Sequence, residues 1–258
     1  MAYTNFDEFF AWYTAQIREQ VPDFEEHLPK NTDIIHSQLR NLTGAEVKEM
    51  NEFIKSLIKL PKDIRLIYFP YDPVNKLTTF ASTYDTSAKK FNIYYPTVTW
   101  FMREIPECIK EVIKHEMGHI LNKDCFVESE ENHQSCVNRS MDARINMHLN
   151  YDQLDYASRC LNFVNEPSYF VKPQEYYPEI GLEVVEGGYS WDFAHEQYHR
   201  FNKPMPGRKI PKLGPFRGGY KPGPPEIKTP EDNEIELLKL AGEIRESIQT
   251  LNGIISEA

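Results

Sequence analysis

The residues best placed to do chemistry are His115, Glu116 and His119, in the stretch His115-Glu116-Met117-Gly118-His119. Residues four apart share one face of a helix, so the two imidazoles would converge on one point. That spacing lets both bind a single zinc ion at about 2.0–2.1 Å. Glu116 lies about 100° further round such a helix, where its carboxylate can act as a general base on water. We therefore predict a zinc site here.

The flanking residues indicate that this stretch is helical. Pro106 stands where a helix favours its first residue. An apolar face follows at helical spacing, made by Ile109, Val112, Ile113, Ile120 and Leu121. Gly118 in a helix interior costs about 1 kcal/mol relative to Ala. We expect it to be kept because another backbone comes close there.

The surrounding sequence predicts an α+β fold, mostly helical with a small sheet. Apolar periodicity and a Thr43-x-x-Glu46 capping box predict two helices, over 6–21 and from 43 to about Leu60. Short β-rich runs predict three strands, and the remaining elements are a short helix and two longer ones. The strands are expected over 64–69, 77–82 and 91–95, and the helices over 98–103, from Pro106, and over 132–150.

A third ligand must come from another element, because a catalytic zinc usually takes three protein ligands. The expected helix over 132–150 carries Asn138, Asp142 and Asn146 at i, i+4 and i+8, beside an apolar stripe. A carboxylate there can reach the metal, with the two asparagines orienting it or bracing the helix. An ordinary solvated stripe is the alternative interpretation.

Other residues compete for the third position. Cys125 lies six residues after His119, the offset of the third histidine in metzincins, although Asn122 stands where those proteins have a turn glycine. The remaining candidates are His133, Glu128, Glu130 and Glu131. The spacing alone leaves these alternatives open.

Taken together, these motifs resemble the metallopeptidase domains often encoded beside von Willebrand A-like domains and MoxR-type ATPases. The resemblance covers about Thr79 to Tyr156, through the strand before the His-Glu helix and the Asn-x-x-x-Asp-x-x-x-Asn helix. It implies a zincin-like domain with one Zn²⁺ per chain, held by His115, His119 and Asp142. Glu116 would be its catalytic carboxylate. No von Willebrand A-like domain follows, and the helices before residue 60 do not match.

The function expected from the motif and the resemblance is hydrolysis of a protein or peptide by a zinc-activated water. The extended run Phe91, Asn92, Ile93, Tyr94 and Tyr95 is the predicted substrate strand, aligning a peptide by β-augmentation. The main alternative is a structural zinc protein of a larger assembly, for example a phage particle. A nucleic-acid-binding accessory is a weaker hypothesis.

Composition narrows the partners and the compartment. A formal charge of −10 argues against a general nucleic-acid binder. No apolar run is long enough to span a membrane, and the first residues lack a signal-peptide pattern, so we expect a cytoplasmic or virion-associated protein. Four cysteines without CxxC spacing are typical of reduced thiols.

The C-terminal third divides into three parts. His195 to His199 repeats the His-Glu-x-x-His pattern in polar surroundings, and we interpret it as a structural or substrate-side helix. The expected domain covers 1–202, with N-terminal helices in 1–60 and the sheet and metal site in 61–160. A basic Pro/Gly-rich linker over 203–230 and an amphipathic helix over 231–258 follow. The heptad seam of that helix predicts a protein partner or self-association.

Overall fold

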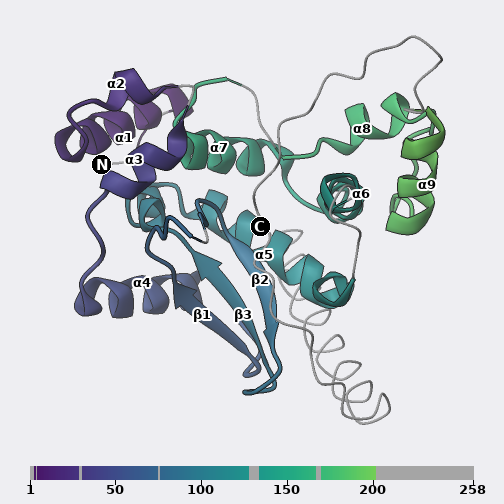
Figure 1. Cartoon of the computed structure of the whole chain (residues 1–258), viewed down its shortest axis with the longest axis horizontal. Coiled ribbons are helices and arrows are strands. Elements are labelled where there is room, and N and C mark those ends of the chain that lie inside the picture. Colours follow the sequence, from purple (N-terminus) through teal and green to yellow (C-terminus); the bar gives the residue numbers. More distant parts are fainter. Residues whose placement is uncertain are drawn as a thin grey trace.

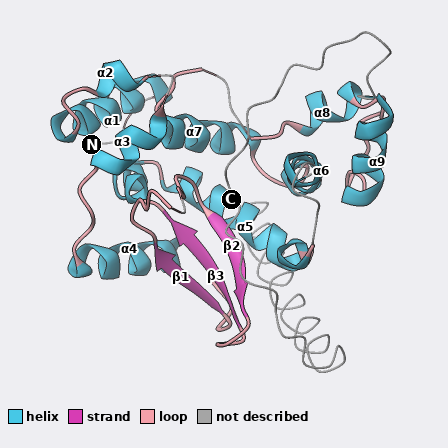
Figure 2. Ribbon diagram, viewed as in Figure 1, coloured by secondary structure: helices cyan, strands magenta, loops and turns pink. Residues whose placement is uncertain are grey.

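The computed structural model describes residues 3, 5–28, 31–74, 76–127, 134–166 and 170–201 (Figure 1). The helices are α1 (Phe6–Gln20), α2 (Phe24–His27), α3 (Thr32–Gln38), α4 (Gly44–Leu57), α5 (Pro106–Leu121), α6 (Gln134–Asn146), α7 (Tyr151–Asn162), α8 (Pro173–Glu179) and α9 (Trp191–Phe201). The strands are β1 (Ile64–Tyr68), β2 (Ala81–Asp85) and β3 (Lys90–Tyr95), with 3-10 helices η1 (Thr97–Glu104) and η2 (Asp124–Phe126). The prediction of a mostly helical α+β fold with a small sheet is confirmed (Figure 2).

The first helix buries its aromatic face against the rest of the main core. Its buried residues recur at helical spacing and are Phe6, Phe9, Phe10, Tyr13, Thr14 and Ile17. Tyr13 also donates its hydroxyl to the carbonyl of Cys160 in α7, at 2.6 Å. The helix predicted over 6–21 is therefore confirmed. The short helices α2 and α3 were not predicted, since four and seven residues are too few for a clear period.

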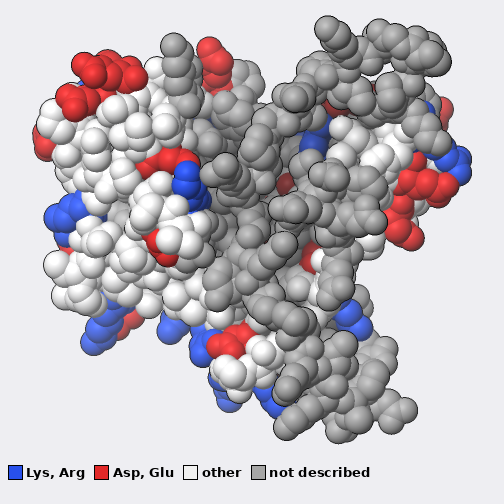
Figure 3. All heavy atoms as spheres, viewed as in Figure 1, with Lys and Arg blue, Asp and Glu red and all other residues white. Residues whose placement is uncertain are grey.

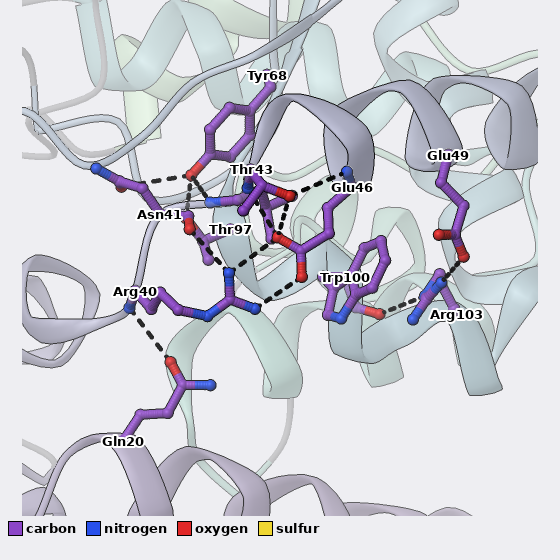
Figure 4. A network of polar contacts seen from close by, with 11 residues as sticks. Gln20, Arg40, Asn41, Thr43, Glu46, Glu49, Tyr68, Thr97, Trp100 and Arg103 are labelled. Atoms are coloured by element: carbon purple, nitrogen blue, oxygen red, sulfur yellow. Dashed lines mark hydrogen bonds and ion pairs between the residues drawn. The ribbon is translucent and has the colours of Figure 1, made fainter.

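The start of α4 is fixed by the predicted capping box (Figure 4). Thr43 accepts the N–H of Glu46, and Glu46 accepts the N–H of Thr43 at 2.7 Å. Arg40 forms two parallel hydrogen bonds with the Glu46 carboxylate, at 2.9 and 2.8 Å. Tyr68 of β1 accepts the N–H of Leu42 at 3.1 Å, so the helix cap is joined to the sheet. The helix ends at Leu57, three residues before the expected boundary.

The strand expected to receive substrate lies in the middle of the sheet. The strand order is β1-β3-β2, with β3 parallel to β1 and antiparallel to β2. The prediction that Phe91–Tyr95 aligns a peptide by β-augmentation is therefore wrong. Both edges of β3 are already used by its neighbours, and augmentation requires a free edge.

The second strand begins later than expected, at Ala81 instead of Leu77. Pairing with β3 sets its length, from Ala81 opposite Tyr94 to Asp85 opposite Lys90. Asp85 ends the strand because its carboxylate accepts the N–H groups of the following turn, including that of Ser87 at 3.0 Å. The short helix expected over 98–103 is η1, which has 3-10 geometry.

The long helix α5 lies at the centre of the molecule. It contacts α7, α6, β2, η1 and α4, so nearly every face of it is covered. Pro106 occupies its first turn as predicted. Figure 1 shows α5 running between the sheet and the helices of the other side. This burial encloses charged as well as apolar side chains, because Glu111, Lys114, His115 and Glu116 are all buried in it.

The helix expected over 132–150 is α6, which covers Gln134–Asn146, and the helix α7 that follows it was not predicted. α6 ends at Asn146, and the Asn150 side chain caps α7 by accepting the N–H of Gln153. Glu111 of α5 accepts the N–H of Asn150 at 3.1 Å. Its other oxygen forms a buried 2.6 Å ion pair with Lys114. Because Asn150 is bound from both sides, the chain turns there and does not continue as one helix.

A smaller apolar cluster joins α6 to α8 and α9. Its buried members are Ala143, Val171, Tyr176, Tyr177, Ile180 and Ala194. α6 therefore has α5 on one side and α9 on the other (Figure 1). The linker expected over 203–230 and the helix over 231–258 lie outside the described residues.

The described surface is mixed in charge, with acidic side chains gathered over α1 and α2 on the face drawn in Figure 3. The first turns of these helices contribute Asp7, Glu8, Glu25 and Glu26. Within the described part of the chain, no helix is both long and apolar enough to cross a bilayer.

The α4 cap generates a pH-dependent prediction. Hydrogen bonds from Arg40 and from the Thr43 backbone lower the pKa of Glu46 from 4.5 to about 2. A carboxyl whose pKa is lower in the folded state stabilises the protein above its unfolded pKa, and this stabilisation is lost as the pH falls through the folded value. Glu46→Gln keeps a capping side chain but removes the charge. We expect it to lower the free energy of unfolding at pH 7, with the difference shrinking between pH 4.5 and 2. Urea unfolding across this range measures it, and a constant difference would contradict the assignment.

Candidate metal centre

Three side chains converge where α5 meets α6. The Nε2 atoms of His115 and His119 are 3.1 Å apart. The Oδ1 atom of Asp142, on α6, lies 3.2 Å from the nitrogen of His119 and 3.6 Å from that of His115. Two ligands bound at about 2.0–2.1 Å at a tetrahedral angle are about 3.3–3.4 Å apart. The three separations therefore suit one metal ion with tetrahedral geometry.

The imidazole of His115 is held in one tautomer by an amide of α6. Its Nδ1 lies 2.7 Å from Oδ1 of Asn146. The amide orientation is fixed in turn, because Nδ2 of Asn146 donates to the carbonyl of Val171 at 2.8 Å. The amide oxygen must then accept, so Nδ1 of His115 carries the proton. The neutral ring thus directs the lone pair of Nε2 at His119 and Asp142.

The imidazole of His119 is held in the same way by Asp124. Its Nδ1 lies 3.0 Å from Oδ2 of Asp124, whose Oδ1 accepts from Arg144 at 2.9 Å. A carboxylate accepts only, so Nδ1 of His119 is the donor and Nε2 is again the nitrogen that faces Asp142. A carboxylate–histidine pair of this kind orients metal-binding histidines and makes them more basic. α6 therefore supplies one candidate ligand, orients His115 through Asn146, and through Arg144 holds the Asp124 that orients His119.

The charges around the three groups attract a cation. Burial lowers the pKa of His115 below its usual value. Burial also lowers the pKa of His119, but Asp124 and Asp142 outweigh it and raise that pKa to about 10. Burial raises the pKa of Asp142, yet the two histidines outweigh it and hold that pKa low. In the metal-free site the raised pKa of His119 means that its Nε2 carries a proton, which it donates to Asp142, and a metal ion binds there by displacing this proton.

Glu116 is buried beside the three groups without being one of them. Its side chain accepts no hydrogen bond from the described residues, and its charge acts on both histidines. Within the described part of the chain, His115, His119 and Asp142 are the one group of three such side chains with ligand atoms within 4.8 Å. The arrangement offers three ligand atoms and an uncommitted carboxylate.

The other predicted residues differ in where they lie. Asn146 contacts His115 directly, whereas Asn138 makes no hydrogen bond to His115, His119 or Asp142. Glu128, Glu130, Glu131 and His133 lie outside the described residues.

Cys125 is directed away from the cluster. Its Sγ lies 3.7 Å from the carbonyl oxygen of Ser82 in β2, and burial raises its pKa to about 12. Among the described residues, Cys125 is not part of the group whose ligand atoms lie close enough to share one ion, so Asp142 is the better third ligand.

Asp124 was not identified from the sequence. It follows α5 after Lys123, whose φ of 61° turns the chain back toward His119. The sequence suggested Asn122 as the left-handed residue, but Asn122 is right-handed with φ −84°. An acidic residue just beyond the end of a His-Glu-x-x-His helix was the available signal.

The close approach expected at Gly118 is made by a side chain of α6. A Cβ atom on Gly118 would lie 2.6 Å from Cγ2 of Ile145. That γ carbon is next to the backbone and cannot move without shifting α6. Gly118 therefore sets the distance between the two helices that carry the cluster.

The second His-Glu-x-x-His pattern lies on α9. The Nε2 atoms of His195 and His199 are 2.9 Å apart. Glu196 is exposed and paired with Arg200, so it differs from the uncommitted Glu116. Across the described residues, no carboxylate or thiolate completes a group of three at this pair. The interpretation of α9 as a structural or substrate-side helix stays a prediction.

Comparisons with known proteins give no family for the chain. No protein-family model matches it, and no curated protein or solved structure matches it significantly.

The orienting role of Asp124 predicts a graded loss of metal. We expect His115→Ala, His119→Ala and Asp142→Ala each to abolish or strongly reduce zinc binding. Asp124→Ala should weaken it by about 10–100-fold, the usual effect of removing a residue that orients a ligand. Cys125→Ala, on the same short helix, is the matched control and should leave affinity unchanged. Competition with a chelator measures the series, and a stronger loss in Cys125→Ala than in Asp142→Ala would reverse the ligand assignment.

The helix spacing at Gly118 predicts a second effect on the metal. Gly118→Ala removes a helix-propensity cost of about 1 kcal/mol but overpacks the crossing, which costs about 1–3 kcal/mol. We expect zinc affinity to fall because α6 must move outward with Asp142. Adding Ile145→Ala should restore affinity by removing the contacting γ carbon, although it weakens the core. Ile145→Val keeps both γ carbons and should not restore it. Equal zinc affinity in Gly118→Ala and wild type would contradict this account.

Proposed function

We propose that the chain is a zinc-dependent peptidase with a zincin-like catalytic core. The observation that carries the proposal is the convergence of two Nε2 atoms and one Asp142 oxygen beside the uncommitted carboxylate of Glu116. Imidazole and carboxylate ligands in this number suit zinc, and three protein ligands leave a position for substrate or water. The proposal rests on this local geometry and on the sequence resemblance.

Each residue then has a defined task. Zinc, when bound, supplies a Lewis acid for a peptide carbonyl and makes water more acidic. His115, His119 and Asp142 hold the ion, while Asn146 and Asp124 keep the two imidazoles in the tautomer that binds it. Glu116 takes the proton of the attacking water and passes it to the leaving amine. Its location inside the molecule keeps this carboxylate away from competing bulk water.

The strand proposed to align a peptide is β2. Of the three described strands, β1 and β2 are at the edges, and β2 is the edge strand that packs against α5. An extended peptide paired with β2 would run beside the helix that carries His115 and Glu116. Backbone pairing gives little sequence preference by itself, so we expect unfolded protein or peptide segments as substrates.

A purely structural zinc is the second candidate, and the described geometry favours it less. Structural sites are closed by four protein ligands. The described cluster has three, and Glu116 beside it would be a costly buried acid without a catalytic task. The partner expected at 231–258 lies outside the described residues and stays a prediction.

The decisive experiment separates catalysis from metal binding. Glu116→Gln keeps the shape of the side chain but removes the base, so we expect zinc content to be unchanged and hydrolysis to fall by about 10²–10⁴-fold. The assay is the appearance of new N-termini in a mixture of unfolded proteins, read by mass spectrometry, with and without chelator.

Glu196→Gln is the matched control, because Glu196 holds the same place in the second pattern but pairs with Arg200 at the surface. We expect it to hydrolyse at the wild-type rate. Hydrolysis by Glu116→Gln at the wild-type rate, or hydrolysis that survives full removal of metal, would refute the proposed mechanism.

A further inference from the structure

The two histidines of α9 face one another as the two histidines of α5 do. Their Nε2 atoms are 2.9 Å apart, and their rings are nearly perpendicular, at 89°. In α5 the corresponding values for His115 and His119 are 3.1 Å and 84°. The same pattern on two helices thus produces the same local arrangement of two imidazole nitrogens.

The rings of this second pair are held by the fold. α9 packs against α6, with Ala194 fully buried and Tyr198 partly buried in the smaller apolar cluster. The Trp191 ring lies 6.3 Å from that of His195, and the Tyr198 ring lies 5.8 Å from that of His199. Packing against α6 therefore fixes the helix that carries the pair, and each imidazole has an aromatic neighbour on the same helix.

We propose that His195 and His199 chelate one exchangeable divalent transition-metal ion, at a site separate from the first. Imidazole nitrogens bind copper, nickel and zinc well. At metal–nitrogen distances of about 2.0–2.1 Å, a separation of 2.9 Å corresponds to an angle of about 90° at the metal, as in tetragonal Cu²⁺ and Ni²⁺ sites. Two protein ligands bind more weakly than three, so this ion exchanges while the first is retained.

We assign metal binding alone to His195 and His199, because the residues described around them include no counterpart of Asp142 or of the unpaired Glu116. α6 presents Asp142 to the histidines of α5, but Ala143 lies in the apolar cluster with Ala194 of α9. Glu196, the counterpart of Glu116, is exposed and paired with Arg200. The second pair thus lacks both the described carboxylate ligand and the uncommitted base of the first.

The test is a titration of the full-length chain with Ni²⁺ after the first site has been filled with one equivalent of Zn²⁺. Isothermal calorimetry should show one further Ni²⁺ bound per chain. A chelate of two linked ligands gains about 10²–10⁴-fold over one ligand, so His195→Ala and His199→Ala should each lower the Ni²⁺ affinity by about 100-fold. His148→Ala, which removes an exposed histidine elsewhere, is the matched control and should have no effect.

Two further variants, one with the second histidine moved and one lacking His119, test whether nickel binds at His195 and His199. His199→Ala combined with Arg200→His moves the imidazole about 100° round the helix and should not restore binding. Retention of zinc at the first site reports that each variant is folded. Unchanged Ni²⁺ affinity in His195→Ala and His199→Ala would overturn the proposal. So would loss of the further equivalent in His119→Ala, because the nickel would then occupy the first site.

Discussion

The metal centre depends on how closely α5 and α6 cross. At Gly118 the helices are so near that a single methyl group would collide with Ile145. The same crossing brings Asp142 within 3.2 Å of His119, and Asn146 within 2.7 Å of His115. A side chain of ordinary size at the crossing would separate these partners together. One glycine therefore determines whether α6 can supply a ligand and a brace at once.

Burying so many polar groups is unfavourable unless each has a partner. Each residue that orients a histidine in the cluster has a partner of its own: Asn146 donates to the Val171 carbonyl, and Asp124 pairs with Arg144. These contacts place a proton on Nδ1 of each imidazole. Nε2 of each ring is then the nitrogen that faces Asp142, where a bound cation would replace the proton that His119 otherwise carries. The hydrogen bonds to Nδ1 thus favour metal binding, because they leave Nε2 of each imidazole as the nitrogen that faces the ion.

Helical periodicity predicted the site residues that lie on helices. It did not predict the site residues whose positions depend on the path of the chain between helices. His115, His119, Asp142 and Asn146 were found because residues four apart on a helix share a face, and the structure brings all of them together. Asp124 was missed because it lies beyond a left-handed turn at Lys123, which no helical period describes.

The choice of substrate strand failed for a related reason. The residues 91–95 do form a strand, but the spatial order β1-β3-β2 follows from packing and is not visible in any single strand. Likewise the helix expected over 132–150 ends earlier, at Asn146, and Glu111, distant in sequence, binds the backbone of Asn150 where the next helix begins. A hydrogen bond between residues so far apart in the sequence produces no periodic pattern from which it could be predicted.

The two His-Glu-x-x-His patterns separate what a motif determines from what its neighbours determine. Both place two imidazole nitrogens about 3 Å apart, as helical spacing requires. Both helices also pack against α6. The difference arises from what α6 presents to each: Asp142 and Asn146 toward α5, and Ala143 of the smaller apolar cluster toward α9. The metal-binding pair is thus a property of the motif, whereas a site with three ligands and a buried base is a property of the helix packed against it.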